Sequence, residues 1–102
     1  MKLTIVQRQV FALPGISSIG NHVRRSGHEV EVVIENAEKN FESVLLATSP
    51  DVVGITICSS DLPWMEETLS RIKRVLPRVF ILVGGIHPTI HPALIKEHTM
   101  ID

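Results

Sequence analysis

The sequence predicts an α/β fold in which a parallel sheet carries helices on both faces. Short runs rich in valine and isoleucine alternate along the chain with segments whose apolar residues recur at helical spacing. The connections between these segments are short, which is typical of repeated strand–helix–strand units. The 44% hydrophobic fraction fits strands that are covered on both sides. At 102 residues the chain has the size of one domain, which we expect to span residues 1–102.

The first expected strand covers residues 2–7, where polar and apolar residues alternate. A loop over residues 8–15 follows it. The next segment predicts a helix that begins near Ser17 or Ser18 and stops at Gly27, with basic residues in its last turn. The apolar face of this helix is formed by Ile16, Ile19 and Val23.

The second and third strands are expected at residues 28–34 and 51–57. The former begins with strict alternation, and the latter is rich in β-branched residues. Between them, residues 35–40 form a polar connection. A short second helix then begins at Phe41 and is closed before Pro50.

The third helix has the clearest periodicity, because its apolar residues recur at spacings of three and four. These residues are Leu62, Met65, Leu69, Ile72 and Leu76. Glutamates lie early and basic residues late in this segment, which suits the helix dipole.

The fourth strand is expected at residues 79–83, the most apolar run of the chain. A short helix should follow from Pro92 to about His98. Residues 100–102 look like the start of a further strand, so we expect the sequence to be the front portion of a longer protein.

The loop that begins at Gly84 and Gly85 is the first place to look for function. Two adjacent glycines after a strand indicate that the backbone turns with positive φ or that another group approaches closely. In alternating strand–helix domains the loops at the carboxyl ends of the strands form the ligand crevice. A plain tight turn is the alternative interpretation.

Composition excludes several classes of function. The formal net charge of −1 provides no basic excess for binding nucleic acid. No apolar run reaches about 18 residues, so no membrane span is expected. We expect no signal peptide, because the apolar part of residues 1–7 is too short and is soon followed by polar residues. A single cysteine, Cys58, excludes an internal disulfide and fits a reducing cytoplasm.

The loop residues give little support to four more specific chemistries. A metal site formed by His87, His91 and Cys58 is disfavoured because Pro88 and Pro92 interrupt any helix there. A reactive Cys58 would need a nearby base or helix N-terminus, and a lone cysteine at a strand end is more often an apolar filler. The loop after the first strand has no Gly-x-Gly-x-x-Gly run for a dinucleotide, and the acidic residues of a phospho-acceptor domain are missing. We therefore assign no catalytic and no metal-ligating residue.

Four stretches, in order and spacing, resemble the N-terminal cobalamin-binding domain of radical S-adenosylmethionine enzymes. They are Gly-His-Glu-Val-Glu-Val (27–32), Asp-Val-Val-Gly-Ile-Thr (51–56), Asp-Leu-Pro-Trp (61–64) and Val-Gly-Gly-Ile-His-Pro-Thr (83–89). That group includes proteins similar to the anaerobic magnesium-protoporphyrin monomethyl ester oxidative cyclase and various carbon and phosphorus methylases. The likeness covers nearly the whole chain, and Gly-Gly-x-His-Pro-Thr is its most specific part.

The resemblance implies a flavodoxin-like (Rossmann-like) three-layer sandwich with strand order 2-1-3-4 and a fifth strand that is truncated after Asp102. It also implies that cobalamin lies over the carboxyl rim with its nucleotide tail beside the sheet. The cofactor-binding residues that it implies are Gly15, Thr56, Cys58, Ser59, Ser60, Asp61, Gly84, Gly85, Ile86 and His87. Gly84 and Gly85 would let the tail pass close to the backbone. Thr56 and Cys58 would match the Ser-x-Leu position of the wider fold, with cysteine in place of leucine, and residues 59–61 would contact corrin amides.

Two departures from the wider pattern shape the functional prediction. Residues 8–15 contain no histidine, so cobalt would lack a protein imidazole there. Radical chemistry in this family needs a Cys-x-x-x-Cys-x-x-Cys motif for a 4Fe–4S cluster, but only one cysteine is present. The cluster and S-adenosylmethionine would therefore belong to a C-terminal radical domain beyond residue 102. We expect this chain alone not to turn over substrate, and the full-length protein to be an oxidative cyclase or a methyltransferase.

The leading prediction is therefore a cobalamin-binding module that presents the corrin to that radical domain. The alternative is a degenerate domain that docks a partner domain without cobalamin, as would follow if Phe11, Trp64 or Met65 packed over Gly84 and Gly85. A small thiol or metal enzyme would need Cys58 close to His87. We also expect self-association through the exposed edge of the fourth strand.

Overall fold

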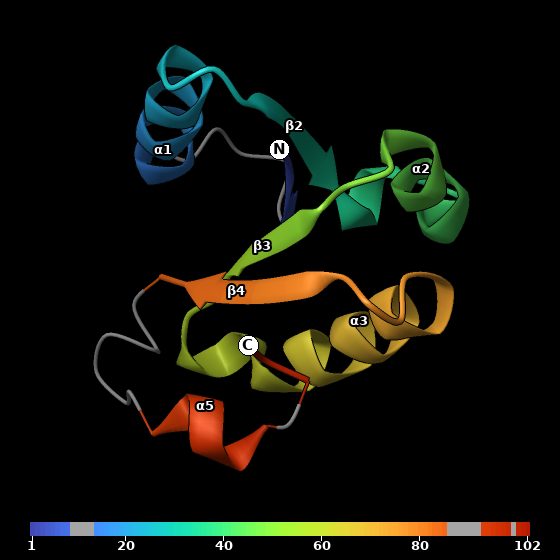
Figure 1. Cartoon of the computed structure of the whole chain (residues 1–102). Coiled ribbons are helices and arrows are strands. Elements are labelled where there is room, and N and C mark those ends of the chain that lie inside the picture. The colour runs from blue at the N-terminus through green and yellow to red at the C-terminus, as the bar shows by residue number, and fades with distance from the viewer. Residues whose placement is uncertain (9–13, 86–92, 99) are drawn as a thin grey trace.

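The computed structural model describes residues 1–8, 14–85, 93–98 and 100–102. They contain a four-stranded sheet whose strand order is β2-β1-β3-β4. All three pairings are parallel. The strands are β1 (Lys2–Gln7), β2 (Glu29–Ile34), β3 (Val52–Thr56) and β4 (Phe80–Gly84). The predicted α/β class and strand order are confirmed (Figure 1).

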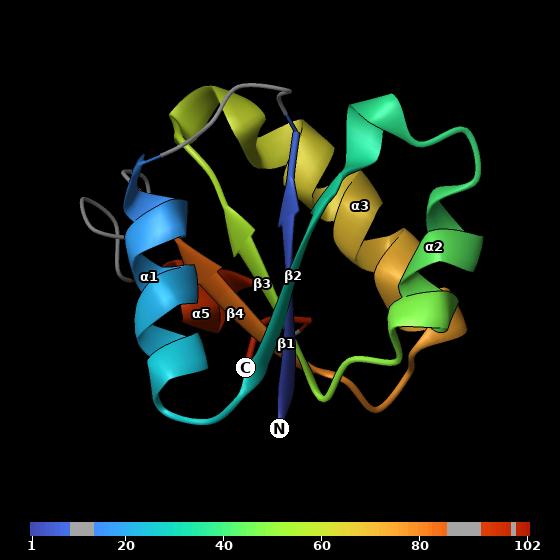
Figure 2. The ribbon, with the colours of Figure 1, turned by 90° about the horizontal axis from the view of Figure 1, so that it is seen from above.

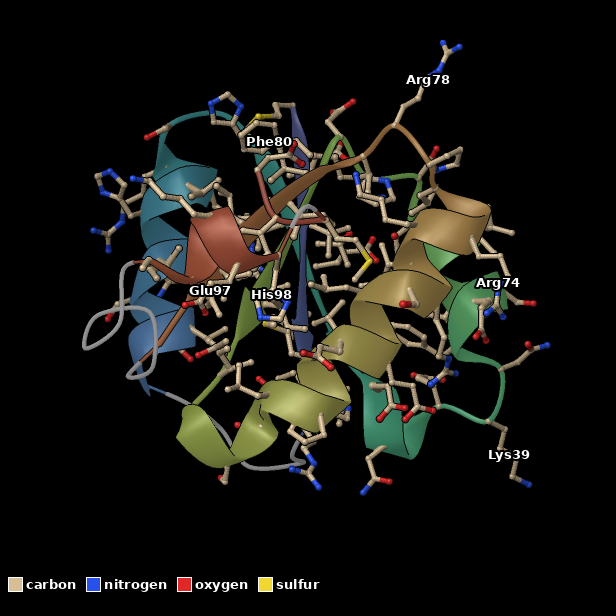
Figure 3. All side chains as sticks on the ribbon, turned by 90° about the horizontal axis from the view of Figure 1, so that it is seen from below. Lys39, Arg74, Arg78, Phe80, Glu97 and His98 are labelled. Carbon is tan, nitrogen blue, oxygen red and sulfur yellow. The ribbon has the colours of Figure 1, made fainter. Side chains whose placement is uncertain are left out.

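Helices cover both faces of this sheet, so the fold has three layers. Figure 2 shows α1 (Pro14–Arg25) on one side of the strands, with α2 (Phe41–Thr48) and α3 (Leu62–Val75) on the other. The short helix α5 (Leu94–Glu97) lies on the α3 side. There His98 Nδ1 is 3.8 Å from Glu66 Oε1 of α3 (Figure 3).

The helical segments differ from the expected ones at the start of α1 and by two short 3₁₀ turns. Helix α1 begins at Pro14 rather than near Ser17, because the fixed φ of proline suits the first helical position, where no backbone N–H is needed. The polar connection after β2 contains a 3₁₀ turn, Glu35–Ala37, and a second one, Ser59–Asp61, precedes α3. The expected start of the last helix at Pro92 lies outside the described residues.

The larger part of the core lies between the sheet and helices α2 and α3. Side chains alternate along each strand, so Val6, Val53, Ile55 and Ile81 all face this layer. Phe41, Leu45, Leu69 and Ile72 of the two helices are fully buried against them. Each such side chain contributes about 1.5–3 kcal/mol of burial free energy. Buried Thr4 is also satisfied, because its hydroxyl lies 3.1 Å from Thr48 Oγ1.

An ion-pair network fixes α2 against α3. Arg71 of α3 donates from Nε to Glu42 of α2 at 2.6 Å and from Nη1 to Glu35 at 2.8 Å. Its guanidinium also lies 4.9 Å from the ring centroid of Phe41. Trp64 Nε1 donates to the other Glu35 oxygen at 3.3 Å, which holds the indole on this same side of the sheet.

The opposite face is only partly covered by the described residues. Helix α1 packs through Ile16 and Val23 on Leu3, Ile5 and Val30, which belong to β1 and β2. On β4, Phe80 and Leu82 alternate with Ile81 and therefore point to the α1 side, where they are 48% and 49% exposed. The β3–β4 half of this face is thus open.

The last described residue lies at the outer edge of β4. Asp102 donates its backbone N–H to the Ile81 carbonyl oxygen at 3.0 Å, and its Oδ2 accepts the Ile81 N–H at 2.9 Å. This is where the predicted fifth strand would pair, although the described residues contain no fifth strand. Within the same part of the chain, no helix is both long and apolar enough to cross a membrane.

Phe80 (Figure 3) offers a test of the predicted self-association through β4. An exposed edge strand with apolar side chains favours pairing with another copy of the chain, and a charge on it opposes that pairing. We expect the wild-type chain to associate as its concentration rises, and Phe80→Lys to shift this association to at least about tenfold higher concentration. Light scattering across a dilution series measures the effect. A wild-type chain that stays monomeric throughout would contradict the prediction.

Candidate functional site

A cleft of about 560 Å³ lies between α1 and the strands β1, β3 and β4. Its volume falls within the range of small-molecule sites, about 300–1,000 Å³. The first turns of α1 form one wall, and the α1-facing side of the sheet forms the floor, up to the carboxyl ends of β3 and β4. The described residues that line it are Leu3, Ile5, Gly15, Ile16, Ile19, Gly54, Ile55, Thr56, Leu82, Val83, Gly84 and Gly85.

The cleft exists because glycines stand where side chains would fill it. Nothing lies within 4 Å of the position that a Cβ would take at Gly15 or Gly84. At Gly54, in the middle of β3, a Cβ would make ordinary contacts with Leu3 and Ile5 at 3.6 and 3.9 Å. Three glycines, one each from α1, β3 and β4, thus leave open space along one cavity. This space forms a cradle for a ligand.

Gly85 has a different role from Gly84. Its φ is +106°, and a Cβ there would overlap the Ile57 carbonyl oxygen and lie 2.8 Å from Thr56 Oγ1. Beside it, the Ile57 N–H donates to the Gly84 carbonyl at 2.9 Å. Positive φ and close approach are alternative expectations for the Gly-Gly pair, and both occur at Gly85. The group that approaches it is the chain's own backbone.

The described site residues fall into two groups. Gly15, Thr56, Gly84 and Gly85 line the cleft. Cys58, Ser60 and Asp61 do not line it; they lie in the loop that leads from β3 into α3, at the same end of the sheet. Ser59 belongs to this loop, but only its backbone is described. Ile86 and His87 lie outside the described residues.

Asp61 organises that loop. Its Oδ2 accepts the Cys58 N–H at 3.0 Å and the Cys58 thiol at 3.2 Å, while its Oδ1 accepts Arg8 Nη1 at 2.8 Å. Burial alone would raise the pKa of this carboxyl group. The hydrogen bonds from the Cys58 backbone, Arg8 and the thiol outweigh burial and hold the pKa below its ordinary value. Both carboxylate oxygens are thus engaged by the protein itself.

This arrangement predicts how stability depends on pH. Because the folded-state pKa of Asp61 is lowered, its ionisation stabilises the fold above the unfolded-state pKa of about 3.9, and that contribution is lost as pH falls through the lowered value. Asp61→Asn should therefore show a smaller loss of unfolding free energy between pH 5 and pH 2 than wild type, measured by urea denaturation. Glu67→Gln, at an exposed position of α3, is the control. Parallel curves for Asp61→Asn and wild type would contradict this prediction.

Arg8 and the aliphatic lining were not predicted as site residues. Arg8 precedes its partner Asp61 by 53 positions, and no local pattern joins them. The glycine inside the third strand was an available signal, because a strand-interior glycine marks close approach of another group. The exposed residues Ile19 and Leu82 gave no such signal, since only the tertiary arrangement places them along the same cleft.

Two of the three side chains that could have packed over Gly84 and Gly85 lie elsewhere. Met65 is fully buried in the core on the α3 side, and Trp64 packs against that same core. Neither covers Gly84, and Phe11 lies outside the described residues. Among the described residues, no three histidine, cysteine or acidic side chains gather to hold a metal ion. The predicted closeness of Cys58 and His87 concerns a residue, His87, that lies outside the described residues.

Comparisons with known proteins agree with this geometry. The sequence profile of the B12 binding domain matches residues 5–102. The chain is also 33% identical over 67 residues to the anaerobic magnesium-protoporphyrin IX monomethyl ester cyclase of Rubrivivax gelatinosus. That alignment covers 65% of this chain and 12% of the cyclase. Because the profile matches almost the whole chain, the protein belongs to the B12 binding domain family, whose ligand is cobalamin.

Proposed function

We propose that this domain holds cobalamin over the carboxyl ends of its strands, with the nucleotide tail in the cleft beside α1. The observation that carries the proposal is the cradle formed by Gly15, Gly54 and Gly84 in a chain that matches the B12 binding domain throughout. The cradle opens at the carboxyl end of a parallel sheet, where ligands of such folds bind.

The lining residues would contribute to cobalamin binding in different ways. The glycines provide room for the tail, and the aliphatic side chains of α1 and the strands bury its apolar surface. The Thr56 hydroxyl can hydrogen-bond to a polar atom of the tail. The Arg8–Asp61 pair holds the loops after β1 and β3 together at the rim, where the corrin would rest. When bound, cobalamin supplies a cobalt centre that can carry an alkyl group.

The reaction of the complete protein is a further part of the proposal. The chain spans 12% of the cyclase, so the catalytic machinery of such a protein lies in other segments. Cys58 is one thiol, whereas a cluster site in a radical S-adenosylmethionine domain needs three. We therefore assign S-adenosylmethionine and a 4Fe–4S cluster to a C-terminal radical domain, and a cytoplasmic oxidative cyclase or methyltransferase activity to the whole.

One observation favours the docking alternative. Phe80 and Leu82 are half exposed on the open half of the α1 face, where a partner domain could rest. In that case the cleft would serve as part of a protein interface and would have no affinity for a corrin.

A titration of hydroxocobalamin and methylcobalamin with the protein distinguishes these functions. We expect the visible spectrum to change, to saturate at one equivalent, and to show cobalt without a protein imidazole. Cobinamide lacks the nucleotide tail and should bind at least about tenfold more weakly, because the cleft contacts are then missing. No spectral change with either cobalamin, confirmed by equilibrium dialysis, would overturn the proposal and leave the docking module.

A further inference from the structure

We propose that the cleft selects among cobamides by their lower base, favouring the apolar dimethylbenzimidazole over a purine such as adenine. This inference rests on the proposed function, since it requires the nucleotide tail to enter the cleft. It adds a specificity that membership of the family does not define.

The described side chains of the lining offer very few hydrogen-bonding partners. Among the described residues that form it, Thr56 alone has a polar atom in its side chain. The backbone of the floor is already engaged, because β3 pairs with β1 on one side and with β4 on the other. Gly54, at the centre of the floor, lies between Ile5 and Leu82 in this ladder.

The two bases differ in how many partners they need. Dimethylbenzimidazole has one ring nitrogen free to accept a hydrogen bond, and the single Thr56 hydroxyl can satisfy it. Adenine carries an exocyclic amine and additional ring nitrogens, and one hydroxyl cannot serve them all. Each polar group buried without a partner costs about 1–3 kcal/mol. The methyl groups of dimethylbenzimidazole would instead be buried by an aliphatic lining, which includes Ile5 and Ile16.

Equilibrium binding of three cobamide probes tests the selectivity: cobalamin, its adenine-containing analogue and cobinamide. We expect cobalamin to bind about 10–100-fold more tightly than the adenine analogue, as the loss of one or two hydrogen bonds implies. Calorimetry or equilibrium dialysis supplies the dissociation constants without any catalytic activity.

A polar substitution at the mouth of the cleft should weaken the selectivity. Ile19 lines the cleft and is 56% exposed, so Ile19→Gln adds an amide donor and acceptor at little cost to folding. It should reduce the preference for cobalamin by at least about threefold, because the amide can partner the adenine. Leu46→Gln is the matched control, since Leu46 is 52% exposed on α2, on the other side of the sheet.

The outcomes separate this inference from the proposed function. Tight cobalamin binding with equal affinity for the adenine analogue would overturn the selectivity and leave the function standing. Equal binding of cobinamide and cobalamin would overturn the placement of the tail in the cleft, and the selectivity with it. A preference that Ile19→Gln reduces and Leu46→Gln preserves would establish the inference.

Discussion

Replacing Gly85 by alanine is expected to lower the free energy of unfolding by about 2–5 kcal/mol, from backbone strain together with overpacking. The φ of +106° is rarely adopted by a residue with a side chain. The added Cβ would also meet the Ile57 carbonyl oxygen, Thr56 Oγ1 and the Ile57 nitrogen at once. Two of these are backbone atoms of Ile57, directly after the end of β3, so they cannot turn away as a flexible side chain could.

Gly84→Ala is the matched control, because it adds the same methyl group one residue earlier, where nothing lies within 4 Å. We expect its unfolding free energy to stay within about 1 kcal/mol of wild type. Urea denaturation followed by far-ultraviolet circular dichroism compares the two variants. Equal stabilities would show that the β3–β4 junction relaxes around a side chain, against the role assigned to Gly85. A domain of this size has about 5–15 kcal/mol of stability in all, so the predicted loss is large enough to measure.

The fold was predictable where one periodic pattern decided the outcome. Helix α3 begins at Leu62 as predicted, because its apolar spacing and the flanking proline leave few alternatives. The alternation of strands and helices indicated a parallel sheet, whereas the order 2-1-3-4 came from the resemblance of four stretches to a known family. Periodicity does not state which strands are neighbours, because that depends on the direction in which each helix crosses the sheet.

The site was predictable only in part, for a related physical reason. The Gly-Gly pair marked a place that borders the cleft, but a sequence does not show which glycine faces open space and which meets the backbone. The same limit applies to Asp61: the family resemblance implies that its carboxylate contacts the ligand, while in the structure its two oxygens accept hydrogen bonds from Arg8 and Cys58. That it also contacts the corrin remains a prediction. Long-range ion pairs and cleft walls arise from tertiary packing, which the spacing of residues along the sequence does not reveal.

The separation of Gly84 from Gly85 also decides which variant reports on binding. Because Gly85→Leu would damage the β3–β4 junction, a loss of binding in that variant would not distinguish an obstructed cleft from a disturbed fold. Gly84 lines the cleft, its φ is not among the positive ones, and the space beside it is empty. A side chain there can be accommodated by the protein and still exclude a ligand.

Gly84→Leu should therefore reduce the affinity for hydroxocobalamin at least about 100-fold, a loss of roughly 2.8 kcal/mol of binding free energy, because the leucine occupies the volume that the nucleotide tail needs. Its unfolding transition should remain cooperative, and its affinity for cobinamide, which has no tail, should change by less than about threefold. Ser43→Leu adds the same side chain at an exposed position of α2, on the other side of the sheet, and should leave the affinities for hydroxocobalamin and cobinamide unchanged. If Gly84→Leu bound hydroxocobalamin as tightly as Ser43→Leu does, the tail would have to lie outside the cleft. In that event the glycines would serve packing alone, and only the rim beside Asp61 would remain as a contact for the corrin.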